Sequence, residues 1–568
     1  MKETVISGLR DHSPETSIHP FRSVVKWPRI SGKIQERNLF TVALYLGATV
    51  FSVLVLIVPL YLIVRTGTAW SEAVKTLTQP ATLKVLGNTG LLVGSVTFAA
   101  AVLAIPLAWL TTRTDLPGRR LWSVLHALPL VMPSYIYAFL FVSFLSPKGL
   151  LQQLLAPLFN IERLPSIYGF GGAFVVLTLI SYPYIFLPVK AALRQMDPTL
   201  LEIAQTDGAG KRQILRHVLL PYLWPSLAAG GLLVALYCLR DFGAVTMLQY
   251  STFTRVIYNR YQAFQLDNAA TQATLLVLIT GVIMMFESRW RNDPENEPLE
   301  ISDQVDNKLF KLGRWRWPAL LFTGAVSFAS LFLPIGILSY WIARGLQQAW
   351  LKDSTTLVQE NTLIFSDLLE PAQSSFLIAL GAAALAVLLA LPIAILSVRY
   401  RGRWATFFER LSYSSYALPG IVVALAFVYI GINFARPLYQ TVPMLMAAYM
   451  VLFVPLAVAA ERTALSRIPV ELEEVGYSLG GSRWEILRYV TLPLMRPGLV
   501  AGGSLVFLTA MKELPATLLL SPLGFRTLPM LVWANISEAF FVRAAIPTLL
   551  LLLLSSVPLA WMSIRENK

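Results

Sequence analysis

Long apolar runs dominate the pattern of hydrophobic and polar positions in this sequence. Four clear examples are Leu39–Val64, Leu91–Leu110, Gln373–Val398 and Ala544–Met562. About 20 apolar residues in a helix cross a hydrocarbon layer roughly 30 Å thick, and helices satisfy their own backbone polar groups in lipid. The pattern therefore predicts an all-α, polytopic membrane protein with about twelve transmembrane helices. The predicted spans begin near residues 39, 88, 121, 167, 221, 269, 318, 373, 411, 440, 497 and 543.

Composition and charge agree with a membrane protein. Of 568 residues, 56% are hydrophobic and 14% are charged, whereas soluble domains carry about 25% charged residues. With a cytoplasmic N-terminus, 32 of the 46 Lys and Arg residues lie on the cytoplasmic side, 12 lie outside, and Arg240 and Lys512 remain within or at the edge of the membrane. This asymmetry follows the positive-inside rule. The net charge of +14 therefore reflects topology and not a nucleic-acid partner, and both termini are expected in the cytoplasm.

An internal repeat relates the two halves of the chain. Glu202–Leu236 aligns with Glu474–Leu508 at a constant offset of 272 residues, which continues from Arg240-Asp241 to Lys512-Glu513. In the first copy the identically matched residues are Glu202, Gly208, Ile214, Leu215, Arg216, Leu220, Pro221, Pro225, Gly230 and Gly231. Upstream, at an offset of 286, Pro106, Arg113 and Pro133 match Pro392, Arg399 and Pro419. A repeat of this length predicts two homologous units.

The repeat sets the expected domain organisation. Residues 1–38 form a cytoplasmic N-terminal segment, 39–286 the first six-helix domain, 287–317 a polar cytoplasmic linker and 318–568 the second six-helix domain. Six helices per domain return the chain to the side it left. The halves are therefore expected to be parallel repeats about an axis along the membrane normal, since inverted repeats need an odd number of spans.

Both copies of the repeat contain a permease signature. They resemble the EAA motif of ABC import permeases, in which a Glu is followed by Gly six residues later and by Pro nineteen residues later. The matching residues are Glu202, Gly208, Leu220 and Pro221 in the first copy and Glu474, Gly480, Leu492 and Pro493 in the second. The alanines usual after the Glu are replaced by Ile203-Ala204 and Val475-Gly476, which are small or apolar. Two copies in register identify the chain as a fused two-domain permease of an ABC importer.

Local chemistry predicts two short helices in each EAA loop, residues 197–221 and 469–493. A proline near the start of each loop fits the first turn of a helix, and Gly208 and Gly480 permit a tight turn. The Leu-Pro pair at the end of each loop either ends the second helix or leads into the next span. An ordinary amphipathic cytoplasmic loop remains the alternative.

The resemblance implies that these loops couple the permease to ATP hydrolysis. The first helix and the glycine turn would dock into a separate cytoplasmic ATPase, of which an importer carries two copies. Glu202 and Glu474 would be charged contacts, and Asp207 and Leu479 would lie near the tip. ATP binding would pull on both loops, and the two halves would alternate between inward-facing and outward-facing states.

The chain is expected to have no nucleotide site of its own. Gly208-Ala209-Gly210-Lys211 looks like the end of a phosphate-binding loop, but Arg212 replaces the Ser or Thr that binds magnesium and Gln205 replaces the first glycine. We therefore predict a transport subunit that is not an enzyme and has no catalytic residues or bound cofactor, with ATP and magnesium on the partner ATPase. The single Cys238 and the four scattered histidines suggest no metal site.

A second resemblance concerns the substrate. Lys512–Leu520 (KELPATLLL), followed by Ser521–Phe525, resembles fused two-domain iron(III) permeases, and Arg240–Val245 (RDFGAV) is its counterpart in the first half. The resemblance implies ferric iron as substrate, an extracytoplasmic binding protein that delivers it, and a location in the bacterial inner membrane. Fused permeases for thiamine and for phosphonates share much of this pattern, so those substrates remain open.

Two charged dipeptides are candidate residues of the translocation pathway. Arg240-Asp241 and Lys512-Glu513 follow the proline that opens their span by about 15 residues, or roughly 22 Å of helix, which predicts a position in the outer part of the membrane. A charge at mid-span costs about 2.5–3.5 kcal/mol and usually faces a cavity or a partner. One hypothesis is that Asp241 and Glu513 line an outer gate and favour a cation, balanced by Arg240 and Lys512. The other is that the pairs lock helix packing.

Two other protein classes are alternatives. An ion-coupled secondary transporter would place its coupling residues at mid-membrane, often on broken helices, and would leave the duplicated loop unexplained. An integral membrane enzyme would need a cluster of His, Asp or Cys at one membrane face, and the sequence suggests none.

Overall fold

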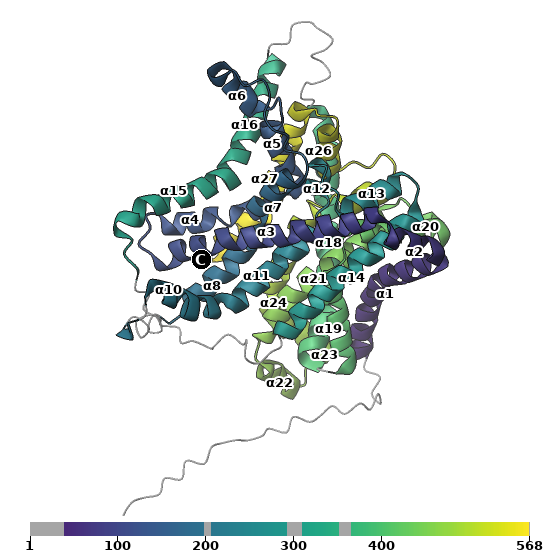
Figure 1. Cartoon of the computed structure of the whole chain (residues 1–568). Helices are drawn as coiled ribbons and strands as arrows, with labels where there is room; N and C mark the ends of the chain where they lie inside the picture. The colour runs from purple at the N-terminus through teal and green to yellow at the C-terminus, as the bar shows by residue number, and fades with distance from the viewer. Residues whose placement is uncertain are drawn as a thin grey trace, which may run out of the picture.

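The computed structural model describes residues 39–197, 206–208, 210–291, 309–350, 365–400 and 402–566, which form an all-α assembly (Figure 1). The expected segment 1–38, Glu202 and most of the linker 287–317 lie outside the described residues. Among the described residues, ten helices are long and apolar enough to span a membrane, and one bent helix pair is an eleventh candidate. The twelfth predicted span falls on α27 (Phe541–Glu566), in which Phe541–Ser556 is a shorter apolar helix.

The first half contributes six of these candidate spans. They are α1 (Leu39–Thr68), α3 (Pro80–Arg113), α5 with α6 (Ser134–Leu145 and Leu150–Phe159), α7 with α8 (Phe170–Ser181 and Pro183–Gln195), α11 (Leu220–Arg240) and α14 (Leu266–Arg291). The shorter elements between them are α2 (Trp70–Thr78), α4 (Arg119–Leu125), η1 (Leu128–Val131), α10 (Lys211–Ile214), η2 (Leu215–Leu219), α12 (Gly243–Met247) and α13 (Phe253–Gln262).

The second half repeats this order. Its long elements are α15 (Arg316–Ser327), η5 (Phe328–Phe332) and α16 (Leu333–Trp350) in one span, α18 (Leu369–Ile395) with η7 (Leu396–Tyr400), α19 (Arg403–Ser415) with α20 (Gly420–Asn433), α21 (Val442–Ser466), α24 (Leu492–Ala510) and α27. The shorter elements are η4 (Gly313–Trp315), η6 (Phe365–Leu368), η8 (Arg436–Leu438), α22 (Val470–Ser478), α23 (Arg483–Ile486), η9 (Leu487–Thr491), α25 (Pro515–Leu520) and α26 (Leu528–Ser537).

The third span of each half is broken at a repeated proline. In the first half the apolar helix begins at Ser134 and not near residue 121, because Pro133 adopts an extended conformation and separates α5 from the short α4 and η1. In the second half Pro419 has the same conformation, and α19 and α20 meet at a bend of 107°. A proline cannot donate the backbone hydrogen bond that would continue the helix, so both breaks occur where a helical hydrogen bond is already missing.

Each half has a core of three tightly packed helices, α3, α8 and α11 in the first and α18, α21 and α24 in the second. Glycines of the repeat allow the close approach. A Cβ atom on Gly230 would lie 2.7 Å from Ile185 Cα, and one on the equivalent Gly502 would lie 3.2 Å from Ala457 Cα. Small residues at such contacts are typical of membrane helices, where close backbone packing replaces the hydrophobic driving force.

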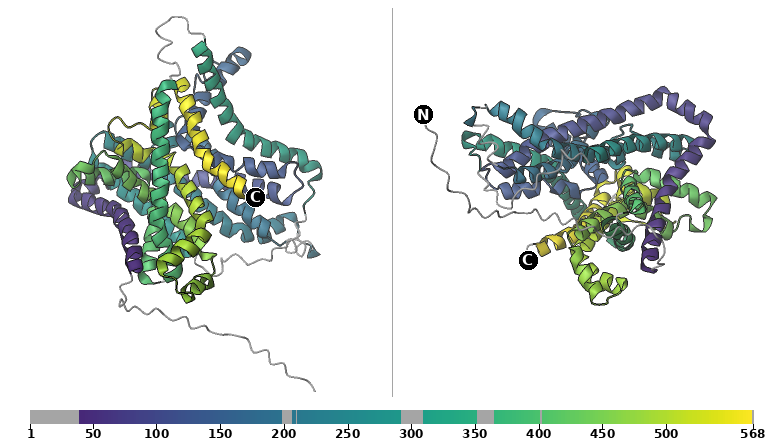
Figure 2. Two further views of the ribbon diagram at one scale, coloured as in Figure 1. Left: turned by 180° about the vertical axis from the view of Figure 1, so that it is seen from behind. Right: turned by 90° about the horizontal axis from the view of Figure 1, so that it is seen from below.

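The first span of each half packs against the other half. α1 contacts α18, α19, α20 and α21 as well as α14, and the rings of Tyr61 and Tyr429 lie 5.1 Å apart. Reciprocally, α16 contacts α5, where Trp341 donates a hydrogen bond to Ser143 Oγ at 3.1 Å. Within its own half, α16 runs beside α27, which is yellow in the rear view of Figure 2. Because the first span of each half packs on the other half, the two halves form one body. We refer to this arrangement as the exchange of first spans.

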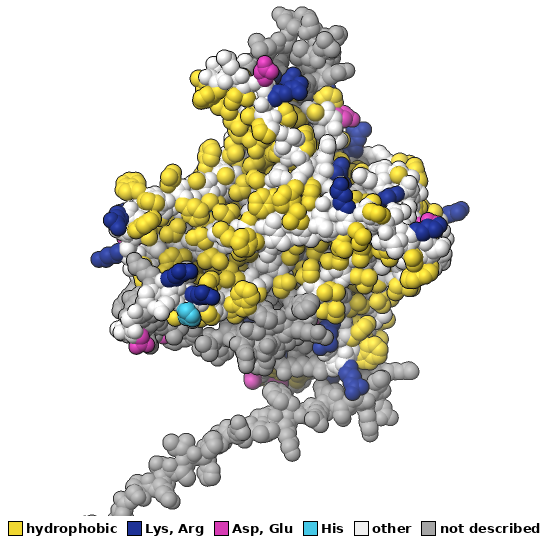
Figure 3. Space-filling view, viewed as in Figure 1, with side chains coloured by type: hydrophobic (Ala, Val, Ile, Leu, Met, Phe, Trp, Pro, Cys, Tyr) yellow, Lys and Arg dark blue, Asp and Glu magenta, His cyan; other side chains and the backbone are white. Residues whose placement is uncertain are grey.

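Apolar side chains cover the outside of the helices. They form most of the face shown in Figure 3, while Lys and Arg side chains gather toward its edges. Phe98 on α3 and Leu321 on α15, for example, are 73% and 76% exposed. A surface of this kind is expected where lipid replaces water around the protein.

Candidate translocation pathway and coupling loops

The second EAA loop has the predicted form of two short helices joined by a glycine turn. Pro469 precedes α22, which runs to Ser478, and Gly480 has a φ of +87°. The next helix, α23, begins with a capping box in which Ser482 accepts from Glu485 N and the Glu485 carboxylate accepts from Ser482 N. The chain then continues through the π-helical turn η9 into α24, so Leu492-Pro493 marks the beginning of the span.

The first EAA loop is described in part. Asp207 and Gly208 are exposed, and Gly208 has a φ of +78°, matching the turn at Gly480. The π-helical turn η2 begins at Leu215 and leads into α11 with Pro221 in its first turn, in register with η9. Glu202 lies outside the described residues.

Two of the predicted coupling residues are exposed at the tip of the second loop. Glu474 is exposed on α22, and the side chain of Leu479 is 83% exposed beyond its end. α10 and α22 both lie toward the lower edge of the helical assembly in Figure 1. Both loops therefore project from the same end of the molecule.

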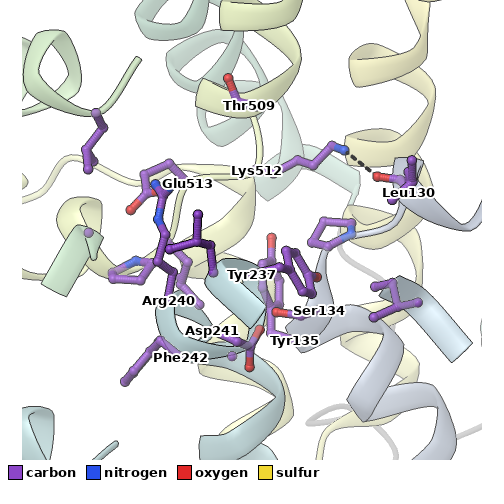
Figure 4. Close-up of a pocket in the computed structure, with 18 of the residues that line it drawn as sticks. Leu130, Ser134, Tyr135, Tyr237, Arg240, Asp241, Phe242, Thr509, Lys512 and Glu513 are labelled. Carbon is purple, nitrogen blue, oxygen red and sulfur yellow. Dashed lines mark hydrogen bonds between the residues drawn. The ribbon is translucent and has the colours of Figure 1, made fainter. Parts of the chain in front are cut away.

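The two charged dipeptides meet at one cavity of about 270 Å³ between the halves. It is lined by Arg240 and Asp241 of the first half and Lys512 and Glu513 of the second (Figure 4). The further polar residues of its wall are Ser134, Tyr135, Tyr184, Tyr237, Tyr416 and Thr509. The structure thus brings all four predicted pathway residues together.

Each acidic residue stands at a break in the fifth span of its half. α11 ends at Arg240, and Asp241 Oδ1 accepts hydrogen bonds from the backbone N–H groups of Ala244 at 3.0 Å and Val245 at 3.2 Å. In the second half, Glu513 Oε1 accepts from Ala516 N at 3.1 Å. The carboxylates therefore cap the short helices α12 and α25, whose N-terminal N–H groups attract negative charge.

Each basic residue reaches across to the other half. The Arg240 guanidinium lies over the ring of Tyr416, 4.8 Å from its centroid, and Lys512 Nζ donates to the Leu130 carbonyl at 3.3 Å (Figure 4). The offset of 286 residues that relates Pro133 to Pro419 also relates Leu130 to Tyr416. The two contacts are therefore equivalent under the internal pseudo-symmetry, at the broken third span of each half.

The four charges are not paired as the sequence suggested. Among the described residues, none of Arg240, Asp241, Lys512 and Glu513 forms a salt bridge, although the Arg240 side chain reaches toward Glu513 in Figure 4. Helix capping and contacts across the interface hold them instead. The hypothesis of an outer gate and the hypothesis of locked helix packing both have support, because the same residues line a cavity and fix helix packing.

Two features of this site were not predicted from the sequence. The tyrosines of the cavity wall come from four different helical regions and share no spacing that would identify them. The break after Arg240 also shows that broken helices are present here, so that criterion does not separate a secondary transporter from a permease.

Comparison with known proteins identifies relatives of both halves. Residues 103–291 and 378–567 each match the family described as binding-protein-dependent transport system inner membrane component. The Fe(3+)-transport system permease protein FbpB 2 of Haemophilus influenzae is 32% identical over 88% of this chain and 93% of its own length. The ferric transport system permease protein FbpB of Actinobacillus pleuropneumoniae is 23% identical over 79% of this chain and 66% of its own. The sulfate transport system permease protein CysT of Salmonella typhimurium is 29% identical over 42% of this chain and 86% of its own.

Proposed function

Because this chain belongs to the family of binding-protein-dependent transport system inner membrane components, we propose that it imports ferric iron through the cavity between its two halves. The observation that carries the proposal is this shared cavity, in which Asp241 and Glu513 converge from symmetry-related positions. The substrate follows from the relative that matches 88% of the chain and bears an Fe(3+)-transport name.

The chemistry of the cavity suits brief contact with a hard cation. Carboxylate and phenol oxygens are hard donors, and the wall carries two carboxylates and four tyrosines. Arg240 and Lys512 oppose tight binding, because a nearby positive charge repels a cation. A pathway must release its substrate, so the high-affinity site is assigned to a separate extracytoplasmic binding protein.

Transport is proposed to follow alternating access. Two cytoplasmic ATPase subunits would close on ATP and draw the two EAA loops together. The loops connect directly to the fifth spans, α11, which ends at Arg240, and α24, which ends two residues before Lys512. Movement at the loops would therefore reach the cavity through a single helix in each half. Replacing Glu202 and Glu474 together with Ala should leave the protein in the membrane and uncouple transport from ATP hydrolysis.

The decisive test measures ATP hydrolysis by the chain co-expressed with its ATPase in lipid nanodiscs. The binding protein is added loaded with ferric ion, with thiamine, with a phosphonate or without ligand. Stimulation by the ferric form alone is expected. Stimulation by a different ligand would keep the ABC mechanism and reject iron, and failure of any ATPase to co-purify would reject the proposed coupling.

The orientation is proposed from the charge distribution. Both termini and both EAA loops are placed in the cytoplasm of a bacterial cell, with the multi-pass chain in the inner membrane. Reporter fusions at each terminus test this, because a reporter active only outside the cytoplasm should stay silent at both positions.

A further inference from the structure

A buried ion pair lies directly beneath the second EAA loop. Arg399, at the end of the second span of this half, donates from Nε to Glu473 Oε2 at 3.1 Å and from a terminal nitrogen to Glu473 Oε1 at 3.2 Å. The two side chains are only 13% and 11% exposed. A bidentate Arg–carboxylate pair of this kind fixes orientation as well as distance.

Two further hydrogen bonds extend the ion pair into a four-residue clamp, formed by Arg399, Ile468, Glu473 and Thr491. Arg399 also donates to the Ile468 carbonyl at 3.1 Å, at the end of the fourth span. Thr491 Oγ1, at the beginning of the fifth span, donates to Glu473 Oε1 at 3.0 Å. Glu473 on α22 is thereby tied to the ends of α18, α21 and α24, the three helices of the core.

Neighbouring Glu474 is exposed, while Glu473 is 8% exposed. Adjacent residues of an α-helix are about 100° apart around its axis, so the two acids face different directions. One is available to a partner protein and the other is held by the core. A force on the exposed face of α22 would therefore pass through the clamp to all three core helices.

The first half keeps one part of this arrangement. Arg113, the repeat equivalent of Arg399, donates to the Met196 carbonyl, which matches Ile468 at the offset of 272 residues. The residue at the position of Glu473 is Leu201, which cannot accept a hydrogen bond from its side chain. At this position of the repeat, the second half has a carboxylate and the first half has an apolar side chain.

We propose that Glu473, held by Arg399 and Thr491, is a positioning residue that transmits movement of the second coupling helix to the membrane helices. This inference rests on the proposed role of the EAA loops. It distinguishes the two loops at this position of the repeat, where the second half has Glu473 and the first half has Leu201.

The test uses the full chain with its ATPase in proteoliposomes and compares Glu473→Leu, the double variant Arg399→Leu/Glu473→Leu, and Glu538→Gln as a control at an exposed position after α26, outside the EAA loop. Removing one partner of a buried pair leaves an unpaired charge, whereas replacing both with apolar residues commonly restores stability. The measurements are thermal stability, ferric ion uptake per ATP hydrolysed, and hydrogen exchange of residues 470–478.

The clamp predicts that the double variant recovers thermal stability but stays uncoupled. Uptake per ATP should fall about tenfold, within the range of about 5- to 150-fold typical of coupling free energies, and exchange within α22 should accelerate. Glu538→Gln should match the unmodified chain. A double variant that recovers both stability and uptake per ATP would reduce the pair to a structural role and overturn the proposal.

The same experiment separates this inference from the proposed function. If the unmodified chain shows no ATP-driven uptake, the transport proposal fails. In that case hydrogen exchange alone tests the clamp. Unchanged protection of α22 in the double variant would then overturn the proposed role of Glu473 too.

Discussion

Asp241 and Glu513 each serve two physical roles at a single position. Their carboxylates cap the short helices α12 and α25 and also line the cavity between the halves. Because the side-chain oxygen of Asn also accepts hydrogen bonds, Asp241→Asn removes the charge and keeps an acceptor for the backbone N–H groups of Ala244 and Val245. We expect Asp241→Asn together with Glu513→Gln to lower ferric uptake by about tenfold, or about 1.4 kcal/mol in barrier height, with the melting temperature unchanged.

The control for charge removal is Glu538→Gln, at an exposed position after α26. It should leave uptake and stability unchanged. Normal uptake in the double cavity variant would assign the two carboxylates to helix packing alone and reject their role in the pathway.

Gly243 shows how closely the backbone approaches at the same break. A Cβ atom there would lie 2.6 Å from Tyr135 Cβ and 2.9 Å from Tyr135 N. Gly243→Ala must therefore displace α5 from α12, and overpacking of this kind costs about 1–3 kcal/mol. Thermal denaturation in detergent should register the loss.

Gly281 provides the matched control for Gly243. It lies within α14, and a Cβ atom at this position would have no neighbour within 4 Å. Gly281→Ala should therefore be neutral or stabilise the protein by up to about 1 kcal/mol. Equal melting temperatures for the two variants would contradict the close approach at Gly243.

At the scale of elements, the glycine turn of the EAA loop is the clearest case of sequence dictating conformation. Gly480 has a φ of +87°, and a built Cβ would meet no atom within 4 Å. The cost of Gly480→Ala is therefore backbone strain alone, about 1–2 kcal/mol for a left-handed non-glycine residue. We expect the variant to lower ATPase stimulation by the loaded binding protein while ATPase binding persists.

Gly336→Ala is the control for the glycine turn. Gly336 lies within α16 and has no positive φ, and a Cβ atom there would also have no neighbour within 4 Å. Full stimulation in Gly480→Ala would show that the turn can change conformation without affecting coupling. Loss of stimulation in both variants would point to a general effect of alanine and not to the turn.

Helix type and the repeat could be predicted from the sequence because both depend on short-range pattern. The apolar runs, the offset of 272 residues and the glycine turns all appear in the described structure. The start of the third span at Ser134 was missed, because the apolar run continues through Pro133 and hydrophobicity alone does not record the break. The clamp at Glu473 was also missed, since it depends on residues 74 positions apart meeting in three dimensions.

At the scale of the whole molecule, the exchange of first spans explains how the halves stay together. α1 packs on the helices from α18 to α21 of the second half and α16 packs on α5 of the first half, so each half supplies a helix that covers part of the other. Two homologous units joined in this way can change their relative tilt only if both exchanged helices move with them. This couples the halves independently of the polypeptide link between them.

The exchange predicts that the covalent link between the halves is dispensable after assembly. A protease site inserted between residues 296 and 297, in the linker, and cleaved in the isolated membrane should leave two fragments that co-migrate in mild detergent. The contacts of Trp341 with Ser143 and of Tyr61 with Tyr429 remain intact in the cleaved protein. ATPase stimulation should also persist, because the coupling loops and the cavity lie outside the linker. Replacing Trp341 with Ala before cleavage should weaken the association, since it removes a buried ring and its hydrogen bond. Separation of the fragments without that substitution would mean that the linker, and not the exchanged helices, holds the two halves in register.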